Sequence, residues 1–190
     1  MIKKLIFLIA FSFLITGCSS EPSQLSYEEI KDLSLDEQVD SIIKNTGLVD
    51  EYEIIVEDNS IAVIYPTEKV ADSNLVLNDR KDSFPNTAML FIEHLEILEL
   101  DEIVITSYDP NTSLTRVSAL FNKETVKELD FSVWNEEKEE YQQRFYRYSD
   151  AYLIRGNVWD KLDDETRTAV NLQKKNSDSQ FWDYYGSYVE

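Results

Sequence analysis

Cysteine, histidine and glycine are scarce in this chain of 190 residues, and each scarcity argues against a class of functional site. Cys18 is the only cysteine, so the chain cannot form an internal disulfide bond. His94 is the only histidine, and one histidine without a Gly-x-Ser-x-Gly motif or further metal ligands indicates neither a hydrolytic triad nor a zinc centre. The four glycines are scattered, whereas loops that bind phosphates or dinucleotides need clustered glycines. We therefore expect no metal and no cofactor.

Lysine and arginine are also few. They number 18 against 37 aspartate and glutamate residues, which gives a formal net charge of -19. Nucleic acid and anionic lipid headgroups would repel a domain of this charge, so we expect no nucleic-acid partner. An acidic surface keeps a protein soluble, and it can also steer a basic protein partner or hold cations loosely.

The N-terminal apolar run, residues 5–15, is shorter than the roughly 20 residues that a membrane-spanning helix needs. It follows Lys3 and Lys4, which is the order of a secretory signal peptide. The run leads into residues 14–18, Leu-Ile-Thr-Gly-Cys, which resemble the lipobox of bacterial lipoproteins. The resemblance implies that Cys18 carries a diacylglycerol and that a second acylation makes the anchor stable. A secretory signal without lipidation is the main alternative, and a cysteine buried in an N-terminal helix is the other.

The same resemblance sets the expected location and domain organisation. The protein would be anchored by its lipid in the cell membrane, on the extracytoplasmic face, with the bilayer as one partner. Residues 1–17 would form the signal peptide, and residues 18–25 the lipidated cysteine with a short polar tether. Residues 26–190 would form one extracytoplasmic domain.

The middle of the chain predicts two units, each a helix followed by a β-hairpin. In the first unit, a capping-box pattern at Ser34 opens a helix that would end at Gly47. Residues 52–56 and 61–65 then alternate in polarity and predict paired strands. A polar connection follows, with a short strand expected at residues 75–77.

The second unit repeats this pattern. An apolar stripe over residues 86–98 predicts a helix, and residues 102–108 and 115–121 predict two strands, followed by a short helix capped by Asn122. Two such units predict an α+β fold with an antiparallel sheet of about four strands and helices on one face.

The C-terminal part is predicted to be helical. Aromatic residues at helical spacing over residues 134–152 indicate one helix, and Gly156 would separate it from a second over residues 158–170. The aromatic end, residues 181–188, is expected to pack back on the body, with an exposed contact surface as the alternative. We expect Trp182 in the core and leave Tyr185 and Tyr188 open. The candidate interface residues at this end are Trp182, Tyr184, Tyr185 and Tyr188.

Three short segments carry a second resemblance. They are residues 86–91 (Asn-Thr-Ala-Met-Leu-Phe), 100–103 (Leu-Asp-Glu-Ile) and 121–124 (Phe-Asn-Lys-Glu). Together they are similar to an uncharacterised extracytoplasmic domain family of Gram-positive bacteria, in which such a helix leads into a strand and later into another helix start. The similarity covers about 40 residues at core and cap positions. It implies an α+β fold and no activity.

The sequence favours a non-enzymatic role in which the domain binds another protein at the cell surface. His94 falls outside the predicted apolar stripe of its helix, so we expect a solvent-exposed imidazole rather than a catalytic one. Two alternatives stay open. One is a cell-wall-active glycoside hydrolase that uses paired carboxylates, and the other is a sensor of a small ligand or cation. The oligomeric state does not follow from the sequence.

Overall fold

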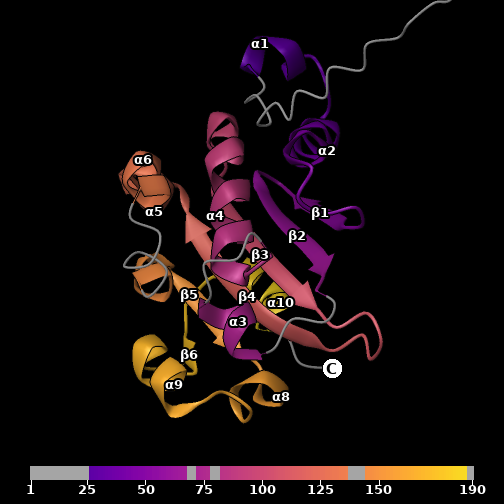
Figure 1. Ribbon diagram of the computed structural model, residues 1–190. Coiled ribbons are helices and arrows are strands. Elements are labelled where there is room, and N and C mark those ends of the chain that lie inside the picture. Colours follow the sequence, from indigo (N-terminus) through magenta and orange to yellow (C-terminus); the bar gives the residue numbers. More distant parts are fainter. Residues whose placement is uncertain (1–25, 68–71, 78–81, 137–143, 188–190) are drawn as a thin grey trace, which may run out of the picture.

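A computed structural model describes residues 26–67, 72–77, 82–136 and 144–187 (Figure 1). The expected signal peptide, Cys18 and the tether lie outside these ranges, as does Tyr188. The described part combines helices with one sheet, so the predicted α+β class is confirmed. The helices are α1 (Tyr27–Ile30), α2 (Leu35–Thr46), α3 (Asp72–Leu77), α4 (Phe84–Leu95), the 3-10 turn η1 (Glu96–Leu98), α5 (Lys123–Glu128), α6 (Phe131–Glu136), α8 (Gly156–Trp159), α9 (Asp164–Val170) and α10 (Gln180–Tyr185).

Within the described ranges, the sheet has six strands in the order of the sequence, β1-β2-β3-β4-β5-β6. The neighbours β2 and β3 run parallel, and the other neighbouring pairs run antiparallel. The prediction of about four antiparallel strands was therefore wrong in strand number and in one pairing. The strands are β1 (Glu53–Glu57), β2 (Ser60–Pro66), β3 (Glu102–Tyr108), β4 (Thr115–Asn122), β5 (Ala151–Ile154) and β6 (Lys174–Lys175).

The parallel pair has a simple cause in the connection between the two hairpins. After β2 the chain passes through α3 and α4 before it enters β3 (Figure 1). A helix between two strands carries the chain back along the sheet, so the next strand starts at the same end as the previous one. Ile61 therefore lies opposite Ile103, and Tyr65 lies opposite Ser107.

Side chains alternate between the two faces of the sheet, and each face has its own hydrophobic cluster. On β3, Ile103 and Ile105 belong to the larger cluster, whereas Val104 between them belongs to the smaller one. This is the period of two that a strand requires. We call the two sides the larger face and the smaller face.

The larger face is covered by helices that come from most of the chain. Helix α2 is capped by Ser34, as predicted, and ends before Gly47, whose φ of 59° is a left-handed conformation that glycine adopts without steric cost. Helix α4 packs against α2 and α3, and nearly all of it is buried. His94 on α4 is only 6% exposed, so the prediction of a solvent-exposed imidazole was wrong. Burial lowers the pKa of the His94 imidazole from its ordinary value.

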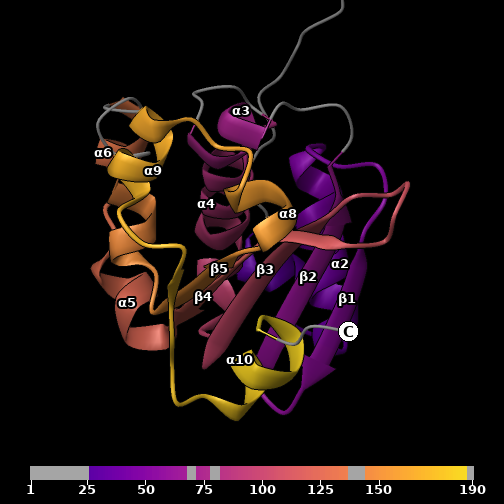
Figure 2. The same cartoon turned by 90° about the horizontal axis from the view of Figure 1, so that it is seen from below.

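The smaller face is covered by the C-terminal helix α10, which lies across the sheet from α2 and α4 (Figure 2). Phe181 and Trp182 on this helix pack on Ala62, Val104 and Leu120 of the sheet. Helices therefore lie on both faces rather than one. Sequence periodicity could not show this, because the helix is only six residues long and reaches the sheet through a long extended segment.

The C-terminal half also departs from the predicted helices. Residues 75–77 lie in α3 and not in a strand. The helix expected over residues 134–152 is not continuous, because Tyr152 belongs to β5, although part of that stretch lies beyond the described ranges. The helix expected over residues 158–170 is divided into α8 and α9. Strand β5 provides backbone hydrogen-bond partners for the edge of β4, which a helix through Tyr152 could not supply.

Candidate functional site

A cavity of about 500 Å³ opens where β5 and β6 meet the end of α10. Its volume lies within the usual range of about 300–1,000 Å³ for small-ligand pockets. We call it the β5–β6 cavity. Its apolar lining comes from Tyr152, Leu153, Gly156 and Trp182, and its polar lining from Arg155, Gln173, Lys174, Asn176 and Ser187.

Strand β6 is held at the sheet edge by contacts of the residues before it. The Tyr152 hydroxyl donates a hydrogen bond to the Leu172 carbonyl oxygen at 2.9 Å. The backbone N–H of Ile154 donates to the Gln173 carbonyl oxygen, and the Gln173 side-chain amide donates to the Ile154 carbonyl oxygen, both at 3.0 Å. Lys174 is thereby paired opposite Leu153, which packs on the smaller cluster. Because paired residues project from the same face of a sheet, the Lys174 side chain lies on the smaller face.

Arg155 forms the wall of the cavity next to β4 and α10. Its backbone N–H donates to the Arg116 carbonyl oxygen at 2.9 Å, and its guanidinium Nη1 donates to the Ser187 carbonyl oxygen at 3.2 Å. The Arg155 side chain is half-buried. Burial lowers the pKa of its guanidinium, a group that nevertheless stays charged at neutral pH.

Helix α10 supplies the apolar wall. The Trp182 side chain is 2% exposed, and the helix is capped by the Ser179 hydroxyl, which accepts a hydrogen bond from the Trp182 backbone N–H at 3.0 Å. The chain after the helix passes directly over the indole ring. A Cβ atom built on Gly186 would lie 2.0 Å from Cε3 of Trp182, so only glycine fits there.

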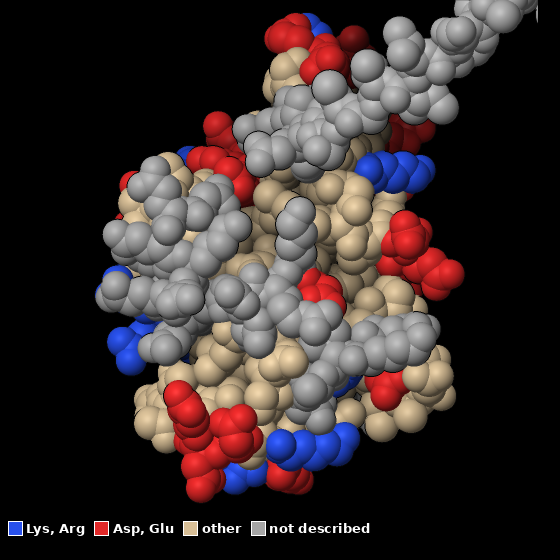
Figure 3. All heavy atoms as spheres, in the orientation of Figure 1, with Lys and Arg blue, Asp and Glu red and all other residues tan. Residues whose placement is uncertain are grey.

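The lining of the β5–β6 cavity has the opposite sign to the chain as a whole. Among the described residues, it contains the cations Arg155 and Lys174 and no Asp or Glu. The full chain has a formal net charge of -19. On the face drawn in Figure 3, acidic side chains are spread over several separate regions instead of forming one patch. Acidic side chains are thus distributed over the face that is drawn, whereas the two cations are local to the cavity lining.

The sequence-predicted interface residues lie in different environments. Trp182 is buried and lines the cavity. Tyr184 is 68% exposed. The Tyr185 hydroxyl donates to the Glu57 carboxylate at 3.2 Å, and its ring lies 4.7 Å from that of Phe181.

Sequence reasoning did not find the polar lining of the cavity. Arg155, Lys174 and Ser187 lie in three segments that meet only in the folded chain, and none belongs to a motif. The single available signal was the basic pair of Lys174 and Lys175 within a strongly acidic chain.

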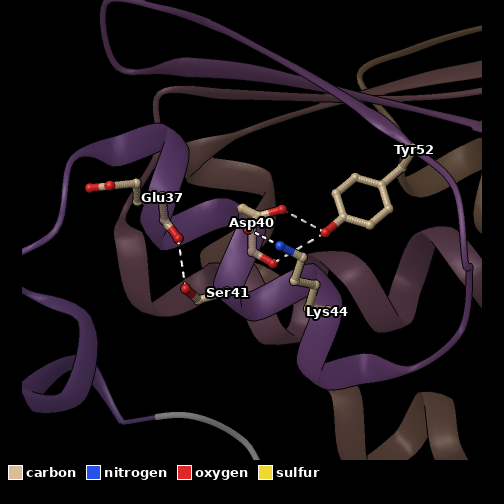
Figure 4. Close-up of polar contacts among 5 residues, drawn as sticks. All are labelled: Glu37, Asp40, Ser41, Lys44 and Tyr52. Atoms are coloured by element: carbon tan, nitrogen blue, oxygen red, sulfur yellow. Dashed lines mark hydrogen bonds and ion pairs between the residues drawn. The ribbon is translucent and has the colours of Figure 1, made fainter.

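A second group of polar contacts joins α2 to the segment before β1 (Figure 4). The Tyr52 hydroxyl donates to Oδ1 of Asp40 at 2.7 Å, and Nζ of Lys44 lies 2.6 Å from Oδ2 of the same carboxylate. The Ser41 hydroxyl donates to the Glu37 carbonyl oxygen at 2.8 Å. The Lys44 ammonium and the Tyr52 hydroxyl lower the pKa of Asp40. The hydrogen bond between Tyr52 and Asp40 ties α2 to the segment that enters β1, and the other contacts of the cluster lie within α2.

No protein-family model, curated protein or solved structure matches this chain. Within the described ranges, no helix is both long enough and apolar enough to cross a bilayer. The same ranges hold no group of three His, Cys, Asp or Glu side chains placed to bind a metal ion.

Proposed function

We propose that this protein is a lipoprotein anchored on the extracytoplasmic face of the cell membrane, with a non-enzymatic role in binding another protein. The observation that carries the proposal is the sequence Leu-Ile-Thr-Gly-Cys at residues 14–18, directly after a basic start and a short apolar run. The first described helix, α1, begins at Tyr27, soon after Cys18. Signal, lipid attachment point and folded domain thus follow one another in the order that an anchored lipoprotein needs.

The tether between Cys18 and the domain is short. Residues 19–25 span at most about 25 Å when fully extended. The domain would therefore stay within reach of neighbouring membrane proteins. We propose a partner from the same membrane or from the adjoining cell wall.

Binding fits the cavity better than the glycosidase alternative does. A two-carboxylate glycosidase needs two acidic side chains that face each other across the substrate site, about 5–10 Å apart. The described residues that line the β5–β6 cavity offer two cations and no carboxylate. A cation sensor would need a lining of the opposite sign.

Replacement of the cysteine tests the anchor. Cys18→Ala removes the thiol that would carry the diacylglycerol, so we expect loss of metabolic labelling by a fatty acid. We also expect the protein to accumulate uncleaved or to leave the membrane fraction. Ser19→Ala is the matched control and should keep label and location. Fatty-acid label retained on the Cys18→Ala protein would refute lipidation at this residue.

Site-specific crosslinking in cells tests partner binding. A photoreactive phenylalanine analogue placed at Tyr184, which is 68% exposed on the smaller face, should give a discrete crosslinked species that mass spectrometry identifies. The control position is Leu114, which is 50% exposed in the turn between β3 and β4. Equal patterns from the two positions, or no discrete species from Tyr184, would argue against a specific partner on this face.

A further inference from the structure

The β5–β6 cavity differs in charge from its surroundings, and this difference restricts what it can bind. Its described lining has two cations, Arg155 and Lys174, in a chain of formal net charge -19. Fields from exposed charges are screened beyond about 10 Å at 0.1 M salt, so a ligand inside the cavity experiences mainly the nearby cations. The acidic remainder of the surface repels anions that lack a close fit. The cavity is therefore selective for an anionic group that can enter it.

The lining also has two chemically distinct sides. The indole of Trp182 and the side chain of Leu153 provide an apolar floor that is continuous with the smaller cluster. Arg155 and Lys174 are the two basic residues among the residues that line the cavity. A ligand that fits both sides combines an acidic group with an apolar portion.

We infer that the β5–β6 cavity binds the carboxylate of an acidic peptide segment, an inference that rests on the proposed protein-binding function. The Arg155 guanidinium stays charged at neutral pH, and a charged group of this kind attracts a carboxylate more strongly than a neutral donor does. The Arg155 guanidinium is held in place by its bond to the Ser187 carbonyl oxygen at 3.2 Å. Lys174 adds a second positive charge from the neighbouring strand.

Carboxylate fits this lining better than phosphate does. Phosphate sites usually present several backbone N–H groups from a glycine-rich loop or from the start of a long helix. Gly156 is the only glycine in the described lining, and the helix it opens has four residues.

Two features favour a peptide over a free organic acid. The side-chain amides of Gln173 and Asn176 each offer a donor and an acceptor, which matches the donor and acceptor of a peptide group. The cavity also adjoins β6, the last strand of the sheet, whose outer edge can pair with an added extended segment.

Calorimetric titration of the purified full chain in a non-ionic detergent tests the inference. The probe is acetyl-Ala-Leu-Glu with its carboxylates free, and the matched control is acetyl-Ala-Leu-Gln with an amidated end. We expect the acidic peptide to bind at least about tenfold more tightly than the neutral one, as loss of a charge-assisted hydrogen bond implies. High salt should weaken binding of the acidic peptide only.

Neighbouring lysines provide a matched pair of variants. Lys174→Gln removes an exposed cation of the cavity lining and should weaken binding of the acidic peptide about tenfold. Lys175→Gln makes the same charge change one residue away, opposite Tyr152, where the ammonium donates to the Ser149 carbonyl oxygen at 2.6 Å. It should leave binding unchanged. Arg155→Gln should abolish binding, and a thermal unfolding midpoint measured for each variant separates lost binding from lost folding.

Several outcomes would overturn the inference. Equal affinity for the acidic and neutral peptides would show that the carboxylate is not recognised. Equal effects of Lys174→Gln and Lys175→Gln would show that the peptide does not bind in the β5–β6 cavity. If inorganic phosphate bound more tightly than the acidic peptide, the ligand of the cavity would be a phosphate group and not a carboxylate. None of these measurements depends on Cys18. A negative result for lipidation of Cys18 would therefore not affect the inference about peptide binding. A negative result for peptide binding would not affect the proposed lipid anchor.

Discussion

The two faces of the sheet differ in how they are covered. Among the described residues, the larger face buries a cluster of thirty hydrophobic residues under helices from α1 to α9, and the smaller face buries a cluster of six under α10. On the larger face, Phe91 and Phe145 are completely buried and their rings contact other aromatic rings. On the smaller face, coverage ends beside β5 and β6, where the β5–β6 cavity opens.

This difference separates stability from binding. Burial of apolar area contributes most of the free energy of folding, so the larger face accounts for most of the stability. A face covered by one short helix keeps polar and charged groups accessible at its margin, where they can contact a ligand. We therefore expect changes on the larger face to affect mainly the free energy of unfolding, and changes near α10 to affect mainly binding.

The largest effect on stability is expected for Phe91→Ala. The Phe91 ring is fully buried on the larger face and meets the Tyr65 ring edge-on at a centroid distance of 5.8 Å. Its truncation should lower the free energy of unfolding by about 3–5 kcal/mol, measured by urea unfolding of the soluble domain from Leu25 onward. Tyr184→Ala on the smaller face is the control and should change it by about 0.5 kcal/mol or less. Similar losses of unfolding free energy in the two variants would show that the larger face does not contribute more to stability than the smaller face.

A smaller loss is expected for Gly186→Ala, and it should affect both properties. The added methyl group would overlap the Trp182 indole, because Cε3 lies only 2.0 Å from the position that a Cβ atom would take at Gly186. The indole or the end of α10 must shift, which should cost about 1–3 kcal/mol and weaken binding of the acidic peptide. Gly156→Ala is the steric control, since its Cβ would meet only Asp160 Oδ2 at 3.9 Å. A Gly186→Ala protein with unchanged stability would show that α10 does not hold the indole in place.

Part of the larger face, α2 and the two hairpins, could be predicted from the sequence because its signals are local. The capping box at Ser34 and the glycine at Gly47 bound α2 as expected. The hairpins β1–β2 and β3–β4 follow from alternating residues on either side of turn sequences. Each of these features depends on residues close together in the chain.

The remaining features depend on contacts between distant segments. The spacing of Tyr148 and Tyr152 fits a helix, but only pairing with β4 places Tyr152 in a strand. His94 is buried although it lies outside the apolar stripe of α4, and the pattern of α4 alone does not contain that information. The cavity joins Arg155, Lys174 and Trp182 from three segments, so no spacing rule could find it.

The smallest effects on the free energy of unfolding are expected for the removal of a tyrosine–carboxylate hydrogen bond, one of which lies on each face of the sheet. On the larger face, the half-buried Tyr52 hydroxyl donates to Asp40 at 2.7 Å (Figure 4). On the smaller face, the Tyr185 hydroxyl donates to Glu57 at 3.2 Å in a more exposed position. Tyr52→Phe and Tyr185→Phe each remove one hydroxyl and keep the ring. The Asp40 side chain is 38% exposed, so solvent screening limits the expected cost of Tyr52→Phe to about 1 kcal/mol. Tyr185→Phe should give no measurable change.

The pH dependence of the Tyr52→Phe effect tests whether it acts through the ionised Asp40 carboxylate. Lys44, and next Tyr52, lower the pKa of Asp40 from its ordinary value of 3.8. A carboxyl group whose pKa is lowered by folding adds stability above its unfolded-state pKa, and that stability is lost as the pH falls through the folded-state pKa. The difference in unfolding free energy between the native protein and Tyr52→Phe should therefore be constant from pH 7 to about pH 5 and shrink below pH 3.8. A difference that stays constant down to pH 2 would mean that the hydroxyl acts without the ionised carboxylate, and a larger effect at Tyr185 would reverse the order of the two faces.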